Sequence, residues 1–302
     1  MMRLFRRSKP KTKTVDTFQY TVQELNNIKS TSDRLSSIGV KPITREFTKR
    51  KTSDTLFILG SGPSINELTS DDLEMIGTHD SVGFNWWMIH DFVPSFYLFQ
   101  FPPNREKNIS DLLSDRRAQY RDVPFMLRGS LLGAHADKYV PIIESVFDKE
   151  STYFMNEFPI HSKCEIDPDK LIEFTANLGF FKHDHIPPYF VKWRGSLGLL
   201  TSFGYAMGYT KIVLCGIDMN DVTAGQHFFD IEDYADARAK YALPGPHEHN
   251  IHTMMDTSHS KNTVGSYIDA LNSHMRDRNE CALFVASNQS SLSSVLPLWK
   301  FA

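Results

Sequence analysis

A turn rich in glycine and serine, Gly60-Ser61-Gly62-Pro63-Ser64, directly follows the short apolar run Thr55–Leu59. Glycines let a backbone approach a ligand closely, and the free N–H groups at the start of a following helix attract phosphate. The turn lacks both the Gly-Lys-Ser/Thr ending of a Walker loop and the third glycine of a dinucleotide fingerprint. The pattern therefore favours either phosphate or nucleotide binding or a plain tight turn.

Polar residues also end two later apolar runs. Asn85 closes the run Ser81–Asn85, and Gly216 and Asp218 close the run Lys211–Asp218. In an open α/β sheet, ligands bind at the carboxyl ends of the parallel strands. Asn85 then binds a base or a ribose, or is an ordinary turn residue, and Asp218 holds ribose hydroxyls or caps a helix.

Two polar segments precede expected helices. In Arg194-Gly195-Ser196, the arginine suits bidentate binding of a phosphate or carboxylate, and the serine suits a helix cap. In His259-Ser260-Lys261-Asn262-Thr263, the histidine suits a general base because imidazole titrates near neutral pH. The alternative for His259, one of 12 histidines, is a surface histidine without a role in chemistry.

Two histidine clusters are candidates for a metal site: His183-Asp184-His185, and His247-Glu248-His249 with His252. Their spacings match no zinc signature well, so solvated loops are the favoured interpretation and no metal is expected. Asp167-Pro168-Asp169 is formally an Asp-x-Asp pair, but Asp-Pro usually starts a turn and no apolar strand precedes it.

These residues need a scaffold, and the hydrophobic pattern predicts one in which strands alternate with helices. Strands are expected over residues 55–59, 81–85, 96–100, 124–127, 211–218 and 281–286. Helices are expected over residues 20–38, 65–76, 108–120, 196–207, 266–275 and 290–298, with Ser70 as an N-cap and Gly208 after a helix end. The alternation predicts an α/β fold with a mainly parallel sheet.

The composition narrows the class of protein. Of 302 residues, 41% are hydrophobic and 23% charged, which excludes a disordered or fibrous chain. No apolar run approaches the ~18 residues of a membrane-spanning helix, and the arginines near the start precede no apolar signal region. Three widely spaced cysteines exclude a disulfide framework, so we expect a cytoplasmic protein with reduced thiols.

The charge is distributed unevenly along the chain. Residues 1–14 contain six basic residues and no acid, which leaves 27 basic against 36 acidic residues in the remainder. An acidic body is a poor nucleic-acid binder, so no nucleic-acid partner is expected. The basic tail is either a solubilising arm or a peripheral contact with anionic membrane lipids on the inner face of the membrane.

In their order along the chain, these segments resemble the bacterial sialyltransferases of glycosyltransferase family 42, which decorate lipooligosaccharide. The resemblance covers residues 55–298, with a poorly matched middle. The matching segments are Ile58–Ser64, Phe84-Asn85, Arg194–Gly198, Gly208–Asp218 and His259–Thr263.

The resemblance implies a GT-A-like, Rossmann-like domain with a small lid, and an inverting transfer from CMP-sialic acid to a glycan hydroxyl. It implies no metal and no cofactor besides the donor, and relatives often form homo-oligomers. The domains would be a basic tail and helical arm over 1–54, a catalytic domain over 55–219 and 259–302, and a lid over 220–258 that covers the donor.

The resemblance also assigns roles to residues. His259 would be the general base that takes the proton of the acceptor hydroxyl. The donor would bind to Ser61, Gly62, Pro63, Ser64, Asn85, Arg194, Gly195, Ser196, Gly216, Asp218 and Asn262.

The chain departs from the family at the leaving group. The two tyrosines that bind the departing phosphate are absent, and Asn220 and His227 stand near their places; Phe101 replaces a donor-binding asparagine. We therefore expect His227 to act on the leaving phosphate, and the donor to be sialic acid or another CMP-activated acid such as 3-deoxy-octulosonate. The alternatives are a pyrophosphokinase-like enzyme of motility-associated glycosylation, which would use ATP and Mg²⁺, and a non-catalytic nucleotide-binding subunit.

Overall fold

The computed structural model describes residues 17–100, 106–129, 136–158, 160, 166–193, 195–219, 226–243, 245 and 262–301. Within these residues, eight parallel strands form one sheet in the order β1-β6-β5-β4-β3-β2-β9-β10. The strands are β1 (Lys41–Pro42), β2 (Thr55–Leu59), β3 (Asp80–Phe84), β4 (Phe96–Phe99), β5 (Phe125–Arg128), β6 (Thr152–Met155), β9 (Lys211–Cys215) and β10 (Ala282–Val285). A separate parallel pair joins β7 (Glu157–Phe158) to β8 (Phe190–Val191).

Helices connect and cover these strands. The α-helices are α1 (Thr17–Ser37), α2 (Ser70–Gly77), α3 (Glu106–Arg116), α5 (Ala136–Val146), α6 (Pro168–Asn177), α7 (Ser196–Ala206), α8 (Ala235–Tyr241) and α9 (Val264–Asp277). The 3₁₀ helices are η1 (Arg45–Arg50), η2 (Pro63–Glu67), η3 (Trp87–Ile89), η5 (Phe228–Asp230), η6 (Glu232–Tyr234) and η7 (Ser291–Ser294). None of these described helices is both long and apolar enough to cross a membrane.

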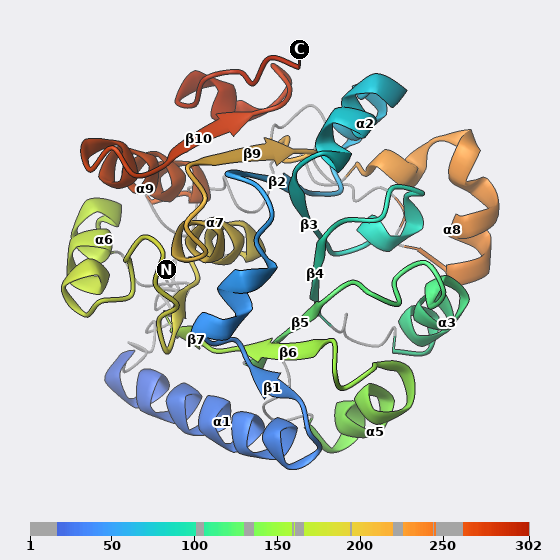
Figure 1. The fold of residues 1–302 in the computed structure, drawn as a ribbon, viewed down its shortest axis with the longest axis horizontal. Coiled ribbons are helices and arrows are strands. Elements are labelled where there is room, and N and C mark those ends of the chain that lie inside the picture. Colours follow the sequence, from blue (N-terminus) through green and yellow to red (C-terminus); the bar gives the residue numbers. More distant parts are fainter. Residues whose placement is uncertain are drawn as a thin grey trace, which may run out of the picture.

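The central strands are apolar because both faces of the sheet are covered. Every residue of β2, β3, β4 and β5 is buried, as is typical of parallel sheets. Figure 1 shows the sheet curving around α7, with α6 and α9 on its concave side and α2, α3, α5 and α8 on the other. Successive side chains of β2 alternate between these layers: Leu56 and Ile58 pack with α7, and Phe57 and Leu59 face the outer helices.

Helix α7 is the centre of the inner layer. All its residues are buried, which explains why its sequence is apolar on every side.

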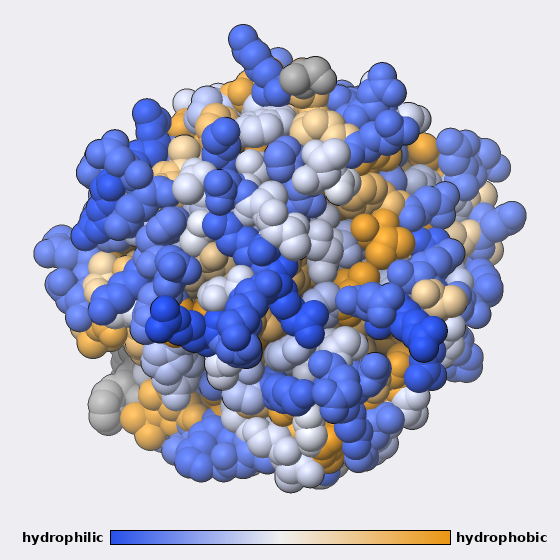
Figure 2. Space-filling model, in the orientation of Figure 1, coloured by the Kyte–Doolittle hydropathy of each residue, from blue (hydrophilic) through white to orange (hydrophobic). Residues whose placement is uncertain are grey.

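The outer surface is different: Figure 2 shows a mostly hydrophilic face on which apolar residues are scattered.

The strand order reverses next to β2. The chain runs outward through β3, β4, β5 and β6 on one side of β2, and then returns to place β9 and β10 on the other side. The β2–β9 boundary is therefore the topological switch point, the place in an open α/β sheet where ligands bind at the carboxyl ends of the strands.

The structure confirms the predicted parallel α/β fold and corrects several local predictions. Ser70 is not the N-cap of α2, because Thr69 Oγ1 accepts from the Asp72 amide at 3.2 Å and forms a capping box. The expected helix over 290–298 is only the short η7, and Leu298 then pairs with Val285. Asp167 starts a helix rather than a turn, since its carboxylate accepts from the Asp169 amide at 3.0 Å and caps α6.

Candidate active site

The turns after β2 and β9 lock together at the switch point. The Gly60 amide donates to Cys215 O and the Gly62 amide to Gly216 O, both at 2.8 Å. A Cβ atom on Gly60 would lie 2.5 Å from Gly216 O, and one on Gly62 would overlap the Asp218 carboxylate. The glycines are therefore required by the close approach of two backbone turns.

Asp218 holds the second half of the turn. The Ser64 amide donates to Asp218 Oδ2 at 3.0 Å, and the Ser64 hydroxyl donates to Oδ1. Both residues are 4% exposed. Asp218 therefore binds the first turn of η2 from across the fold, while the N-cap of η2 is Gly62; the predicted ribose role of Asp218 stays a prediction. The expectation that the amides at the start of the following helix are free for a phosphate is therefore wrong for Ser64, and the Gly60 and Gly62 amides are engaged as well.

The outer part of the turn remains available to a ligand. Ser61, Gly62 and Pro63 are partly exposed, and among the described residues no hydrogen bond engages the Ser61 hydroxyl. The Ser61 carbonyl accepts from the Phe228 amide at 2.9 Å, which docks η5 on the turn.

Gly216 offers a direct test of this packing, because its φ is +63° and a Cβ would lie 2.5 Å from Ile65 Cγ1. We expect Gly216→Ala to lower the free energy of unfolding by about 2–4 kcal/mol, the sum of backbone strain and overpacking. The measurement is urea denaturation. Gly39→Ala is the matched control, since Gly39 also has positive φ but its Cβ would meet only Lys149 Cδ at 3.6 Å. Equal losses in the two variants would show that φ alone matters.

His227 lies beside this turn although it is distant in sequence. It immediately precedes Phe228, and its ring stacks on Phe229 with centroids 4.7 Å apart. His227 Nδ1 is 3.5 Å from Asp230 Oδ2, so a carboxylate sits beside the imidazole. The bond from the Phe228 amide to Ser61 O therefore places His227 next to the β2 turn, and the role of His227 in catalysis stays a prediction. The described part of the expected lid, residues 226–243, packs against η2 and α3.

A second group of residues ends β3 and β4 and starts α7. Asn85 follows β3 with a left-handed φ of +55°, a conformation that asparagine tolerates. Gln100 follows β4, and its Nε2 donates to Asn85 Oδ1 at 3.0 Å. The Ser196 hydroxyl donates to Gln100 Oε1 at 3.4 Å. The N-cap of α7 is Gly195, and Ser196 makes no capping bond, so the structure corrects the prediction that Ser196 caps the helix.

The buried Tyr97 hydroxyl fixes the backbone of Asn85 by a hydrogen bond. The Tyr97 hydroxyl donates to Asn85 O at 2.6 Å and accepts from the Met88 amide at 3.3 Å. Burial raises the pKa of Tyr97 well above its ordinary value, so the hydroxyl keeps its proton and remains a donor.

A buried cluster of charges supports Gln100. Arg128, the last residue of β5, donates from Nη1 to Gln100 Oε1 at 2.5 Å. Its Nε and Nη2 donate to the two carboxylate oxygens of Glu157 in β7, the latter at 3.2 Å. The Arg128 and Glu157 side chains are only 5% and 3% exposed. Lys192 Nζ lies 3.6 Å from Glu157 Oε2, and burial lowers the Lys192 pKa while Glu157 opposes that shift.

Sequence reasoning missed Gln100, Arg128, Glu157 and Lys192. A signal was present for two of them, because Gln100 and Arg128 end buried apolar strands just as Asn85 does. Of the other predicted residues, Asn262 directly precedes the N-cap of α9, and its Nδ2 donates to Ile166 O at 2.7 Å, so its role in donor binding stays a prediction. Arg194, His259, Phe101 and Asn220 lie outside the described residues.

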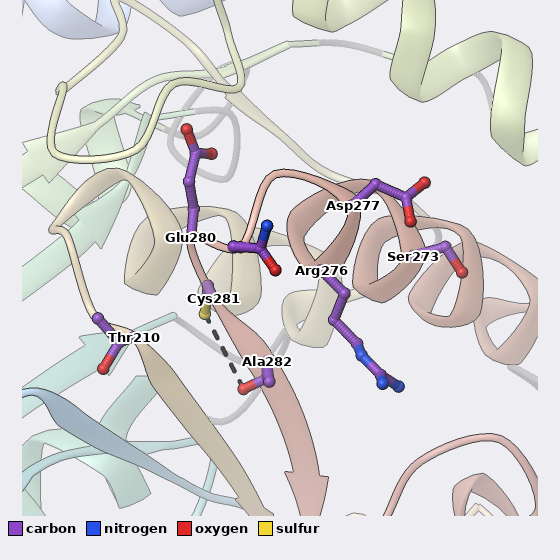
Figure 3. A pocket seen from close by; sticks show the side chains of 8 residues that line it. Thr210, Ser273, Arg276, Asp277, Glu280, Cys281 and Ala282 are labelled. Atoms are coloured by element: carbon purple, nitrogen blue, oxygen red, sulfur yellow. Dashed lines mark hydrogen bonds between the residues drawn. The ribbon is translucent and has the colours of Figure 1, made fainter.

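Neither a metal cluster nor a pocket elsewhere offers a stronger candidate. Within the described part of the chain, no three histidine, cysteine, aspartate or glutamate side chains are grouped as a metal would require. A pocket of about 590 Å³ lies at the amino ends of β9 and β10, the opposite edge from the residues above. In Figure 3 the side chains of Arg276, Asp277 and Glu280 at this pocket point in different directions. The carboxyl edge is therefore the candidate active site.

Known proteins offer a similarity in fold. No family model and no curated protein matches the chain. Among solved structures it is similar to the sialyltransferase CstII from Campylobacter jejuni, solved in complex with the substrate analogue CMP-3FNeuAc, with a TM-score of 0.42 and 15% identity over 82% of this chain and 89% of that one. Similarity at this level says nothing about activity, so the case for a function rests on the residues of the site.

Proposed function

We propose that this chain is a glycosyltransferase that moves a sialic acid, or a related CMP-activated acidic sugar, to a glycan hydroxyl. The observation that carries the proposal is the bridge made by Gln100 between Asn85 and Ser196. These two positions are far apart in sequence, and the resemblance assigns both of them to the donor. Their contact through one side chain at the carboxyl edge of the sheet is what a shared donor site requires.

The residues of the β2 turn and of the segment that begins η5 support the same chemistry. Departure of CMP leaves charge on a single phosphate, and donors aimed at that phosphate stabilise the charge as it develops. Ser61 in the β2 turn and His227, which precedes the Phe228 amide that donates to Ser61 O, are the groups proposed for that role. His259 is proposed to take the acceptor proton on the opposite side of the sugar, which gives inversion.

A metal has no evident purpose in this proposal, because CMP has no second phosphate for a cation to bridge. The pyrophosphokinase-like alternative would instead need carboxylates near the β2 turn to hold Mg²⁺. Asp71 and Asp72 stand on α2 beyond the turn, and the Asp72 carboxylate is engaged in the capping box with Thr69. The Asp218 carboxylate at the turn is buried and accepts from Ser64. We therefore favour the CMP-sugar transferase, acting in the synthesis of bacterial surface polysaccharide or lipooligosaccharide, with residues 1–14 as a peripheral contact with anionic lipids.

The test is a thermal-shift comparison of CMP, ATP and NAD, each with and without EDTA. We expect CMP to stabilise the protein whether or not EDTA is present, by about 2.7 kcal/mol at 100 times the dissociation constant. Asn85→Gly removes the amide while keeping the left-handed backbone, and should lose most of this shift. Asn279→Gly is the matched control, because Asn279 has the same φ of +55° but lies at the opposite edge of the sheet. A shift with ATP and Mg²⁺ but none with CMP would overturn the proposal.

A further inference from the structure

Arg128 determines which way the Gln100 amide faces. A guanidinium group only donates hydrogen bonds, so the Gln100 atom 2.5 Å from Arg128 Nη1 must be the oxygen. Arg128 cannot swing away, because Glu157 binds it at two nitrogens and both side chains are buried. The amide nitrogen of Gln100 is therefore directed to the other side.

The orientation of Gln100 then determines that of Asn85. Gln100 Nε2 donates to Asn85 at 3.0 Å, so the atom that accepts must be Asn85 Oδ1. The Asn85 Nδ2 group consequently faces away from Gln100. No described residue accepts a hydrogen bond from it, and Asn85 is partly exposed at the carboxyl edge. Asn85 thus presents two N–H donors to whatever binds there.

The hydrogen-bonding role left to Ser196 is the opposite of that left to Asn85. Its hydroxyl has one hydrogen, and this hydrogen points to Gln100 Oε1, which lies 3.4 Å away. Ser196 is 7% exposed, and the lone pairs of its oxygen are then what it can offer to a ligand. One glutamine therefore makes one neighbour a donor and the other an acceptor.

We infer that Gln100 is a positioning residue that sets which ligand groups fit this site: an oxygen acceptor at Asn85 and a hydroxyl hydrogen at Ser196. Resting on the proposed function, the acceptor is a phosphate or carbonyl oxygen of the CMP-sugar and the hydroxyl belongs to its ribose or sugar. An amino group, which would bring two N–H donors against those of Asn85, is excluded from the Asn85 position.

The test is Gln100→Glu, which changes one NH₂ group to an oxygen. Arg128 would bind one carboxylate oxygen, and the second oxygen would need a hydrogen from Asn85. Asn85 would turn so that Nδ2 faces residue 100 and Oδ1 faces the ligand, while Ser196 would keep its bond to an oxygen. We expect CMP affinity to fall about 10- to 100-fold, because Asn85 Oδ1 would then face a ligand oxygen to which Asn85 Nδ2 otherwise donates.

A double-mutant cycle separates this effect from simple repulsion between the introduced carboxylate and the phosphate. In the Asn85→Gly background, Gln100→Glu should cost little, because there is no amide to turn. Repulsion or general loss of structure would lower affinity equally in both backgrounds, and that result would overturn the inference. Gln23→Glu, at an exposed position of α1, adds the same charge elsewhere and should leave the affinity unchanged.

A second measurement needs no ligand. Nuclear magnetic resonance of protein labelled with nitrogen-15 at asparagine, assigned with Asn85→Asp, reports the side-chain amide of Asn85 directly. In the Gln100→Glu variant, one side-chain amide proton of Asn85 should shift downfield and exchange more slowly with water, because the Asn85 amide then donates this proton to the carboxylate introduced at position 100. An unchanged signal would overturn the inference. A changed signal together with no CMP binding by the unmodified protein would support the inference and overturn the proposed function.

Discussion

Replacing Arg128 by methionine is expected to lower the free energy of unfolding by about 3–5 kcal/mol, because Glu157 would keep a buried charge without its main partner. The Glu157 side chain is 3% exposed, so water cannot take the place of the guanidinium group. Lys192 Nζ remains 3.6 Å from Glu157 Oε2, which makes the lower end of that range the expected one. Urea denaturation followed by circular dichroism measures the loss.

Two further variants separate burial from simple charge loss. Arg128→Met combined with Glu157→Leu should recover much of the stability, since it removes the unpaired buried carboxylate, while the Lys192 side chain, 30% exposed, can still reach water. Lys41→Met breaks an exposed pair whose side chains are 51% and 83% exposed, and should cost much less than Arg128→Met. If Arg128→Met costs no more than Lys41→Met, the buried pair does not support the site as described.

Replacing His259 by alanine is expected to lower turnover by about 10²–10⁴-fold while leaving CMP affinity nearly unchanged. The physical reason is that a general base acts on the acceptor proton in the transition state and makes little contact with the donor in the ground state. The measurement is CMP release from CMP-sialic acid in the presence of a panel of oligosaccharide acceptors, with CMP binding followed separately by calorimetry.

His274→Ala is the control for this experiment. His274 lies in the last turn of α9, away from the carboxyl edge, and its loss should leave turnover unchanged. Turnover by His259→Ala at the level of the unmodified protein would remove His259 from the proposed mechanism. Loss of CMP binding together with turnover would instead indicate that His259 helps to form the donor site.

Much of the fold follows from local patterns. The run Thr55–Leu59 and the apolar part of Lys211–Asp218 were predicted as buried strands because a strand covered on both faces reads as a continuous apolar segment. β1 was missed because Lys41–Pro42 is too short and too polar to show the hydrophobic pattern of a strand. α6 was missed because Asp-Pro is typical of a turn, and its helix-capping role depends on the amides that follow it.

For the candidate site, the sequence by itself determined which residue types end the strands: the glycines and serine of the β2 turn, Asn85, and Asp218 after β9. Only the tertiary structure decided what these residues do. It directs the Asp218 carboxylate to Ser64, places His227 next to the β2 turn, and joins Asn85 to Ser196 through Gln100. These pairings follow from strand order and sheet curvature, which bring distant residues within hydrogen-bond reach, whereas sequence patterns report only on neighbours along the chain.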